Sequence, residues 1–304
     1  MDLTTMLGKI EMATPVLPAS GTFGYGNELV EVIPYSMLGA IVTKTLTWHP
    51  RQGNPPGRIT ECGDTLINSI GLQNIGVKEF CEEALPKIVR LQKPIIASVG
   101  GDDPDGMLKT VEYLNTEEIT AIELNLSCPN LGTTRLVAQD PEAIKKSVAN
   151  ARSLTLKPLI AKLTPHVADI AETGLAAEEA GANILCAGNT FKGIVFDWKK
   201  ETLLAGGVSG KGIFPLALRT VYDLYQAVTI PIIGMGGISE ASDALAMILL
   251  GATAIGIGTT MLIDPNLPEK VCQVISEYMK KKSITRINDL VGIKNGKKNY
   301  SGSY

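Results

Sequence analysis

Eight short apolar runs, each followed by a segment with helical periodicity, constrain the fold of this 304-residue chain more than any other feature. Their β-branched and aliphatic composition is typical of strands that are buried on both faces in a parallel sheet. The predicted strands are Pro15–Ser20, Ala40–Lys44, Pro94–Val99, Ala121–Leu126, Pro158–Leu163, Asn183–Ala187, Pro231–Met235 and Ala254–Gly258. Eight such units predict an α/β protein built as a single (β/α)8 TIM barrel rather than an open doubly wound sheet.

The helices are predicted beside these strands. They are Asn27–Ser36, Val77–Leu91, Pro104–Leu114, Pro141–Leu154, Val167–Ala180, Ile213–Ala227, Glu240–Leu250 and Pro268–Lys281. A capping residue or a first-turn proline marks two starts, at Asp140-Pro141 and at Ser239, and glycine marks two ends, at Gly181 and Gly251. No linker divides the chain, so we expect one domain over residues 1–304.

Two segments do not fit the strand–helix repeat. Thr45–Asn74, after the second strand, is rich in glycine and proline and predicts a long functional loop. Thr190–Ser209, after the sixth strand, predicts a small excursion over the barrel mouth. Both follow the carboxyl ends of strands, so we expect loop insertions over the C-terminal mouth of the barrel.

Composition narrows the class of function. A net charge of −3 does not indicate a protein that binds nucleic acid. No apolar run approaches the roughly 20 residues of a membrane span. The five cysteines are scattered without Cys-x-x-Cys spacing, and there are only two histidines, which argues against disulfides, metal sites and iron–sulfur clusters in this chain. We therefore expect a cytoplasmic, metal-free protein.

The end of the fourth predicted strand carries the most chemistry. It reads Asn125-Leu-Ser-Cys128-Pro-Asn130, which directs amide groups and one ionisable thiol to a common spot. Such a set can hold a planar polar ring and move one of its protons. The alternative is a strand end with turn-forming asparagines and a buried, inert cysteine, since free cysteine is among the most buried residue types.

Other strand ends are also polar, and the carboxyl ends of barrel strands are where active sites lie. They include Ser20, Lys44, Thr45, Lys162 and Asn189-Thr190. Either lysine alone could extend its ammonium to solvent from a strand edge. Two lysines beside the asparagines favour an anionic ligand in the mouth, because a buried ammonium needs a partner.

Glycine clusters end the last two strands. Gly234-Met-Gly236-Gly237 and Gly256-Ile-Gly258-Thr259, with a third cluster at Gly206–Gly210, can present backbone N–H groups to a phosphate beside a helix N-terminus. The alternative is that the glycines only permit tight turns. Gly234-x-Gly236-x-x-Ser239 lacks the third glycine of a dinucleotide fingerprint, so a Rossmann fold is not favoured.

Together these motifs resemble dihydroorotate dehydrogenase, and in particular the catalytic subunit of its two-subunit, NAD-dependent class. The resemblance covers the chain up to about Lys280. It rests on Pro18–Gly26, Thr43-Lys44-Thr45, Gly53-Asn54-Pro55-Pro56, Asn68–Asn74, Asn125–Asn130, Lys162-Leu-Thr-Pro165, Asn189-Thr190 and the glycine clusters, which occur in the family's order.

The resemblance implies an enzyme with one FMN per chain that oxidises (S)-dihydroorotate to orotate in pyrimidine biosynthesis. Cys128 would be the catalytic base that removes the C5 proton, while a hydride leaves C6 for the flavin. A thiol suits this role because its pKa lies close to neutral pH.

The resemblance also assigns the binding residues. Substrate would be bound by Lys44, Asn68, Ser69, Ile70, Gly71, Leu72, Asn125, Asn189 and Thr190. FMN would be bound by Ser20, Lys44, Thr45, Ser98, Asn125, Lys162, Gly188, Gly210, Gly236, Gly237, Gly258 and Thr259. Lys162 would lie near flavin N1 and O2, where a positive charge favours the reduced flavin.

The chain departs from the family pattern in four places. Ser98 stands where an asparagine is usual, and Gly188 stands where an aliphatic residue is usual. The segment after Cys128 lacks the usual glycine-containing Val-Lys pattern, and Thr190–Ser209 is shorter than usual. These differences bear on flavin contacts and on partner docking.

The resemblance further implies a homodimer, joined into a heterotetramer by a partner subunit that carries FAD and a 2Fe-2S cluster and passes electrons to NAD+. The alternatives are a single-subunit, fumarate-reducing dihydroorotate dehydrogenase or a related pyrimidine-oxidising FMN barrel. More distant ones are an aldolase barrel with Lys44 or Lys162 as Schiff-base amine, and a phospholigand-binding barrel without activity.

Overall fold

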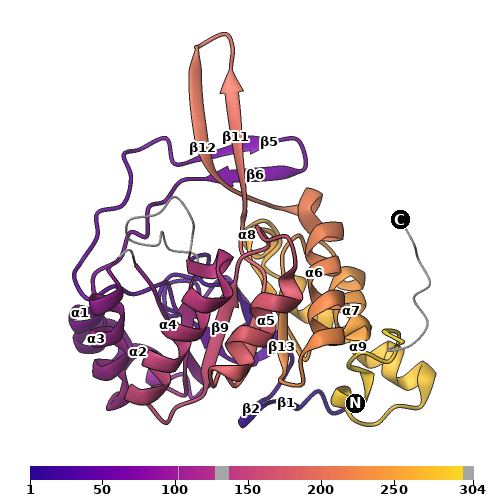
Figure 1. Cartoon of the computed structure of the whole chain (residues 1–304). Helices are drawn as coiled ribbons and strands as arrows, with labels where there is room; N and C mark the ends of the chain where they lie inside the picture. Colours follow the sequence, from indigo (N-terminus) through magenta and orange to yellow (C-terminus); the bar gives the residue numbers. More distant parts are fainter. Residues whose placement is uncertain (102, 127–136, 297–304) are drawn as a thin grey trace.

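The computed structural model describes residues 1–101, 103–126 and 137–296, and its centre is an eight-stranded parallel sheet (Figure 1). Its strands are β3 (Val16–Pro18), β4 (Ile41–Val42), β7 (Ile95–Val99), β8 (Ala121–Asn125), β9 (Leu159–Leu163), β10 (Ile184–Ala187), β13 (Ile232–Met235) and β14 (Ala254–Ile257). They lie in the order β3-β14-β13-β10-β9-β8-β7-β4. The Gly39 N–H donates to the Val16 carbonyl at 2.8 Å and joins the two ends of the sheet. The predicted barrel and all eight predicted strands are confirmed.

Helices surround the barrel (Figure 1). They are α1 (Val77–Glu79), which continues through the π-helical turn η2 (Phe80–Ala84) into α2 (Leu85–Val89), then α3 (Pro104–Asn115), α4 (Pro141–Leu154), α5 (Ile170–Glu179), α6 (Phe214–Ala227), α7 (Ala241–Leu250), α8 (Thr259–Ile263) and α9 (Leu267–Lys282). Short 3₁₀ turns are η1 (Tyr35–Met37), η3 (Val137–Gln139), η4 (Lys211–Ile213) and η5 (Ile287–Leu290). Seven of the eight predicted helices are confirmed, and the Asp140 cap accepts the Glu142 N–H at 3.0 Å.

The predicted helix over Asn27–Ser36 is wrong. This segment forms turns before η1, because Pro34 removes a backbone donor and clashes with the preceding turn of a helix. The Glu28 carboxylate also folds back and accepts the N–H groups of Tyr25, Gly26 and Asn27. These bonds fix a tight turn in place of a first helical turn.

The predicted cap of α7 is displaced by one residue. Glu240, rather than Ser239, is the N-cap, and it forms a capping box with Asp243. Ser239 lies one residue earlier and donates to the same Asp243 carboxylate. One aspartate therefore satisfies both residues at the helix start.

An N-terminal hairpin closes the floor of the barrel. Strands β1 (Thr5–Leu7) and β2 (Ile10–Met12) are joined by a turn at Gly8, whose φ is 61°. Leu7, Ile10 and Met12 are buried in the same cluster as the side chains inside the barrel. The amino ends of the strands are thus sealed by apolar side chains, and only the opposite end is free for chemistry.

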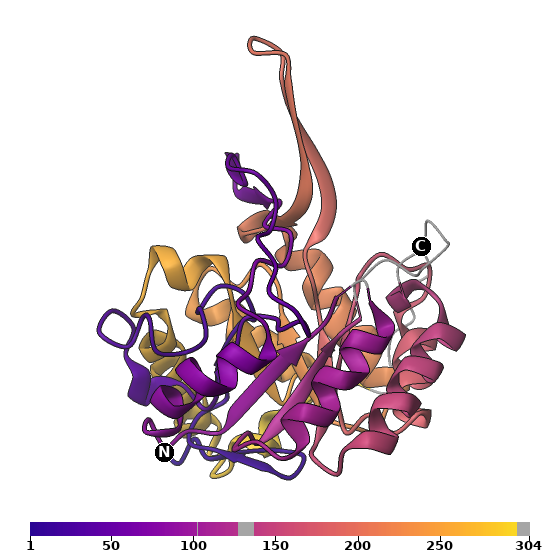
Figure 2. The same ribbon diagram turned by 90° about the vertical axis from the view of Figure 1, so that its left-hand side faces the viewer.

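A second, antiparallel sheet stands over the mouth. It consists of β11 (Phe191–Asp197), β12 (Thr202–Ser209), β6 (Thr65–Asn68) and β5 (Ile59–Cys62), in that order. Thr45–Asn74 is therefore more than a loop, since it contains β5 and β6. The predicted small excursion at Thr190–Ser209 is a long hairpin that projects away from the barrel (Figures 1 and 2).

Across the parts of the chain that the structure describes, the helices are all too short or too polar to cross a bilayer.

Candidate active site

The barrel interior changes from apolar to polar toward the mouth. On adjacent strands, Ile96, Ala121, Ile160 and Ile184 form part of a buried aliphatic cluster. Two residues further along the same strands come Ser98, Glu123, Lys162 and Cys186. Side chains two apart on a strand share a face, so this second set points into the barrel above the first.

The polar layer is a continuous hydrogen-bonded chain. The Asn125 amide donates to Thr45 Oγ1 at 3.3 Å, Thr45 Oγ1 lies 3.1 Å from Ser98 Oγ, and Ser98 Oγ donates to Glu123 Oε1 at 2.8 Å. The same Glu123 oxygen lies 3.7 Å from Lys162 Nζ. Each donor in the chain therefore points toward the carboxylate.

Lys162 is a buried cation. It is 5 % exposed, and Glu123 is 2 % exposed, so the alternative of a lysine extending to solvent is wrong. Burial alone would lower the pKa of Lys162, but the Glu123 carboxylate opposes this, and the net pKa is raised. Lys162 thus carries a fixed positive charge below the mouth.

Cys186 is the described cysteine closest to this layer. It is fully buried, and burial together with the Glu123 carboxylate raises its pKa far above the usual range of a thiol. Its sulfur lies 3.6 Å from the sulfur of Met235. A thiol in these surroundings is uncharged and is not a base.

The predicted substrate asparagines meet at the rim. The Asn189 amide lies 3.3 Å from Asn125 Oδ1, and Asn189 Oδ1 accepts the Thr190 N–H at 2.8 Å. Gly100 lies beside them, where an added Cβ would come within 3.2 Å of the Asn125 Cβ. Gly100 is therefore packed closely against Asn125, and a larger residue at this position would crowd the asparagine.

Lys44 lies at the mouth of the barrel, where the charges of Glu28 and Arg58 act on it. Its backbone N–H donates to the Gly24 carbonyl at 2.8 Å, in the turn that Glu28 stabilises. Burial is the main cause that lowers the pKa of Lys44; Arg58 acts in the same direction and Glu28 opposes it. An anion that entered this part of the mouth would meet the Lys44 ammonium, with Arg58 adding positive charge and Glu28 opposing it.

The predicted substrate loop Asn68–Leu72 is held in shape from both sides. Asn54 donates to the hydroxyl of Ser69 at 2.8 Å, and Asn74 donates to the Leu72 carbonyl at 2.8 Å. Asn68 donates to the Gly207 carbonyl at 3.2 Å, which ties the loop to the projecting hairpin. Gly71 and Leu72 have φ of 75° and 54°, so the turn is tight.

The glycine-rich ends of β13 and β14 lie beside α6. Gly236 and Gly237 follow β13 with positive φ, and a Cβ on Gly237 would lie 2.4 Å from the backbone nitrogen of Phe214, the first residue of α6. Thr259, after β14, donates to Ser209 Oγ at 2.8 Å, next to Gly210. The loops predicted to bind phosphate therefore meet at one helix N-terminus.

Two glycines of the third cluster serve another purpose. Gly206 and Gly207 lie in β12, where a Cβ would come within 2.1 Å of the Asn68 carbonyl oxygen and of Thr190 Oγ1, respectively. They allow the hairpin to approach the substrate loop. Gly188 has a similar role at the end of β10, because a Cβ there would lie 2.5 Å from the Met235 carbonyl oxygen.

Cys128, the predicted base, lies outside the described residues, as does the rest of 127–136. The strand that leads to it, β8, ends at Asn125 in the rim described above.

Sequence reasoning missed Glu123, which joins Ser98 to Lys162. A signal was available: an acidic residue in an apolar strand, two positions before Asn125, has to share the inward face with that asparagine. It also missed Ser209, the partner of Thr259. Its signal was weaker, because Ser209 reaches the site only through the hairpin that was expected to be a loop.

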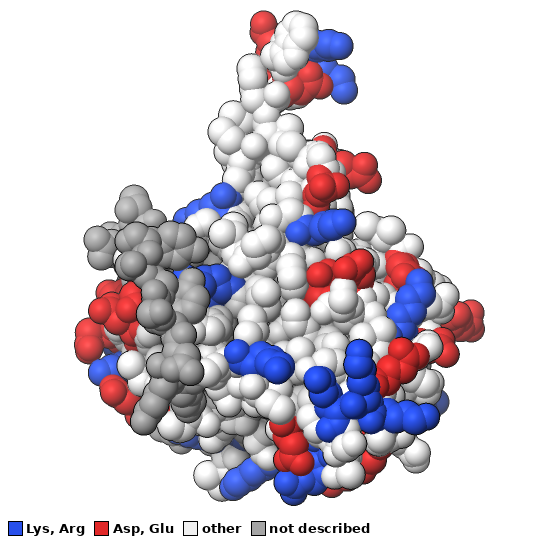
Figure 3. All heavy atoms as spheres, turned by 90° about the vertical axis from the view of Figure 1, so that its right-hand side faces the viewer, with Lys and Arg blue, Asp and Glu red and all other residues white. Residues whose placement is uncertain are grey.

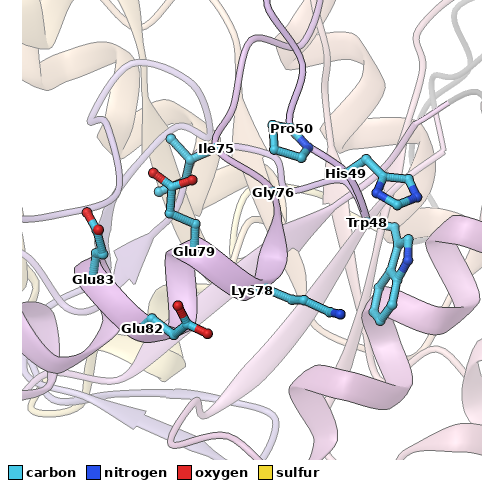
Figure 4. Close-up of a pocket in the computed structure, with 9 residues that line it drawn as sticks. All are labelled: Trp48, His49, Pro50, Ile75, Gly76, Lys78, Glu79, Glu82 and Glu83. Carbon is cyan, nitrogen blue, oxygen red and sulfur yellow. The ribbon is translucent and has the colours of Figure 1, made fainter.

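A surface pocket of about 630 Å³ lies outside the barrel, beside α1 (Figure 4). Trp48 and Glu79 line it, and the Lys78 ammonium lies 5.1 Å from the centre of the Trp48 ring. None of the predicted site residues lines this pocket. Among the residues with described positions, no three His, Cys, Asp or Glu side chains are grouped to hold a metal ion.

A family profile and related proteins match this chain over nearly its full length, and they all name the same family. The profile of the family described as dihydroorotate dehydrogenase matches residues 2–279. A protein of Endomicrobium trichonymphae is 41% identical over 296 residues, which cover 96% of each chain. One of Carboxydothermus hydrogenoformans is 42% identical over 303 residues, which cover 96% of this chain and 97% of that protein. Both relatives are named "Dihydroorotate dehydrogenase B (NAD(+)), catalytic subunit".

Proposed function

Because the chain belongs to the dihydroorotate dehydrogenase family, we propose that it oxidises (S)-dihydroorotate to orotate, with one FMN as its resident cofactor, in pyrimidine biosynthesis. The observation that carries the proposal is the buried chain of contacts from Asn125 to Lys162, with its amides at the rim and a fixed cation below. Amides and an ammonium suit a neutral ring system that gains negative charge on reduction.

The residues present fit FMN at both of its ends. The phosphate would be bound by the backbone of Gly236, Gly237, Gly210 and Gly258, and by Thr259, beside the N-terminus of α6. The close approach of Gly237 to Phe214 leaves no room for a side chain, as a backbone cradle requires. The isoalloxazine would meet Ser20, Thr45, Ser98, Asn125, Lys162 and Gly188 across the mouth.

Dihydroorotate would bind above the flavin. Its carboxylate would pair with Lys44, near the second cation at Arg58. The amides of Asn68, Asn125 and Asn189, with Thr190, would bind the ring. The loop from Ser69 to Leu72 would add backbone contacts, since its turn is already fixed by Asn54 and Asn74.

In the proposed reaction, FMN supplies a two-electron acceptor for the hydride that leaves C6 of the substrate. Cys128 removes the C5 proton as a thiolate, and the C5–C6 double bond of orotate forms. The buried ammonium of Lys162 would lie beside FMN, where a positive charge would favour the reduced form and so the product side. The amides keep the ring oriented between base and acceptor.

The proposed electron path needs a second protein. The relatives are named as catalytic subunits of an NAD(+) enzyme, which supports a partner subunit and NAD+ as final acceptor. We propose that this partner carries FAD and a 2Fe-2S cluster and that both proteins act in the cytoplasm. This favours the two-subunit class over the single-subunit, fumarate-reducing one. A Schiff-base aldolase with Lys162 as its amine is disfavoured, because that chemistry needs a neutral amine and the pKa of Lys162 is raised.

A surface suited to protein partners is present. Ile194, Phe196 and Leu203 lie on one face of the β11–β12 hairpin, since Phe196 pairs with Leu203, and all three are more than half exposed. In the view of Figure 3, no charged side chain is seen on the hairpin between its charged tip and the base of the hairpin. We propose that this surface contributes to a homodimer within a heterotetramer.

The test is reduction of the bound flavin. The purified chain should be yellow, and anaerobic dihydroorotate should bleach its flavin absorbance. A Cys128→Ser variant should keep FMN but bleach roughly two to four orders of magnitude more slowly at neutral pH. A wild-type chain that takes up no FMN would refute the cofactor, and near-normal bleaching by the variant would show that the base lies elsewhere.

A further inference from the structure

The buried carboxylate of Glu123 belongs to no substrate or cofactor contact proposed above. It lies in the middle of β8, opposite Ser98 of β7 in the strand register, and Lys162 of β9 lies opposite Asn125. Glu123 is therefore one inward position deeper than the rim. At this depth it is out of reach of solvent, with 2 % of its surface exposed.

One oxygen of Glu123 contacts two residues of the proposed flavin site. Oε1 accepts the Ser98 hydroxyl at 2.8 Å and lies 3.7 Å from Lys162 Nζ. Because Ser98 donates to Glu123, it is free to accept from Thr45 at 3.1 Å, and Thr45 in turn accepts from Asn125. The carboxylate thus orients Ser98 and, through it, Thr45 and Asn125.

The charge of Lys162 depends on this contact. An ammonium buried without a partner carries a desolvation cost of several kcal/mol and tends to lose its proton. The described groups packed against Lys162 that act on its charge are Glu123 and Cys186, and Cys186 is an uncharged thiol. The Glu123 carboxylate is the group that keeps the lysine protonated.

We propose that Glu123 is a positioning residue that holds the Lys162 ammonium in place and, through it, makes the protein bind reduced FMN more tightly than oxidised FMN. The inference rests on the proposed FMN site. Glu123 does not contact the flavin; it acts on the charge and position of the residue that does.

The experiment measures the midpoint potential of bound FMN in the full-length holoprotein by spectroelectrochemistry, together with the Kd of oxidised FMN by fluorescence quenching. In Glu123→Gln the amide cannot balance the ammonium, so Lys162 loses its proton. The ratio of the affinities for reduced and oxidised FMN should fall at least tenfold, which lowers the midpoint potential by about 30 mV for a two-electron couple. In Glu123→Asp, which keeps the carboxylate, the preference should change less than threefold.

A double-mutant cycle tests whether Glu123 acts through Lys162. Lys162→Met should lower the preference as far as Glu123→Gln does, and adding Glu123→Gln to Lys162→Met should change it less than threefold. The double variant contains no unpaired buried charge, so it folds even where Glu123→Gln alone fails to do so. A further tenfold change in the double variant would overturn the inference.

Other outcomes separate this inference from the proposed function. A yellow wild type whose potential is unchanged or raised in Glu123→Gln overturns the role of Glu123 and leaves the FMN site standing. Equal losses in the Asp and Gln variants overturn it too, because charge would then not matter. A wild type that binds no FMN overturns the proposed function and this inference with it.

Discussion

Replacing Gly237 by alanine should damage stability and FMN binding together. Gly237 has a φ of 72°, in the left-handed region, and an added Cβ would lie 2.4 Å from the backbone nitrogen and 2.5 Å from the Cα of Phe214. A clash with backbone cannot be relieved by a side-chain rotation. The loop after β13 would have to move away from the first turn of α6, where the phosphate site is proposed.

The size of the effect follows from two costs. The left-handed conformation costs an alanine about 1–2 kcal/mol, and overpacking against fixed atoms adds about 1–3 kcal/mol. At about 2.1 cal/mol/K per residue of unfolding entropy, the 304 residues give about 0.6 kcal/mol/K. We therefore expect Tm of the FMN-free protein to fall by about 3–8 °C.

Gly63 provides a matched control. Its φ is 57°, close to that of Gly237, but nothing lies within 4 Å of an added Cβ. Gly63→Ala should therefore show the backbone cost alone, a fall in Tm of about 2–3 °C. It should leave the Kd of FMN unchanged within about twofold. Gly237→Ala should raise this Kd at least tenfold, which is a loss of about 1.4 kcal/mol of binding free energy.

The assays are thermal unfolding of the FMN-free protein by circular dichroism and FMN titration by fluorescence quenching. The difference between the two variants isolates the contact with Phe214. If Gly237→Ala destabilises the protein no more than Gly63→Ala and binds FMN equally well, the loop after β13 is not packed tightly against α6, and the proposed phosphate cradle is refuted.

Three further predictions concern the rim and the hairpin. Lys44→Ala should weaken orotate binding more than tenfold and FMN binding by a smaller factor in titrations, and equal losses would contradict its assignment to the substrate carboxylate. Burial lowers the pKa of His166, whose neutral ring accepts the Lys192 N–H. As the pH falls, this histidine is therefore protonated in the unfolded chain before it is protonated in the folded one. The free energy of unfolding should fall as the pH drops below about 6.5. Urea titrations should show this loss flattened in His166→Gln, and an unchanged slope would refute it. Phe196→Glu should lower the molar mass of the oligomer in light scattering without loss of FMN, whereas the control Lys199→Glu should not change the mass. An unchanged mass in Phe196→Glu would exclude the hairpin from the subunit interface.

Much of the fold was determined by local sequence. Each barrel strand is a short run of aliphatic residues, which is typical of a strand buried on both faces of a parallel sheet. The caps at Asp140 and the glycine at Gly251 depend on neighbours within a few residues, so they too could be predicted. The helix over Asn27–Ser36 failed for equally local reasons, since Pro34 and the turn that Glu28 stabilises both lie in or next to this segment.

Several features were decided only by tertiary structure. The partner of Lys162 is Glu123, 39 positions earlier in the sequence, and the two meet because β8 and β9 are adjacent in the barrel with a fixed register. Gly206 and Gly207 were expected at the phosphate site, but the pairing of β12 with β6 places them against Asn68 and Thr190 instead. Sequence patterns report the surroundings of a residue along the chain, whereas charge pairing and close backbone approach are set by which strands lie side by side.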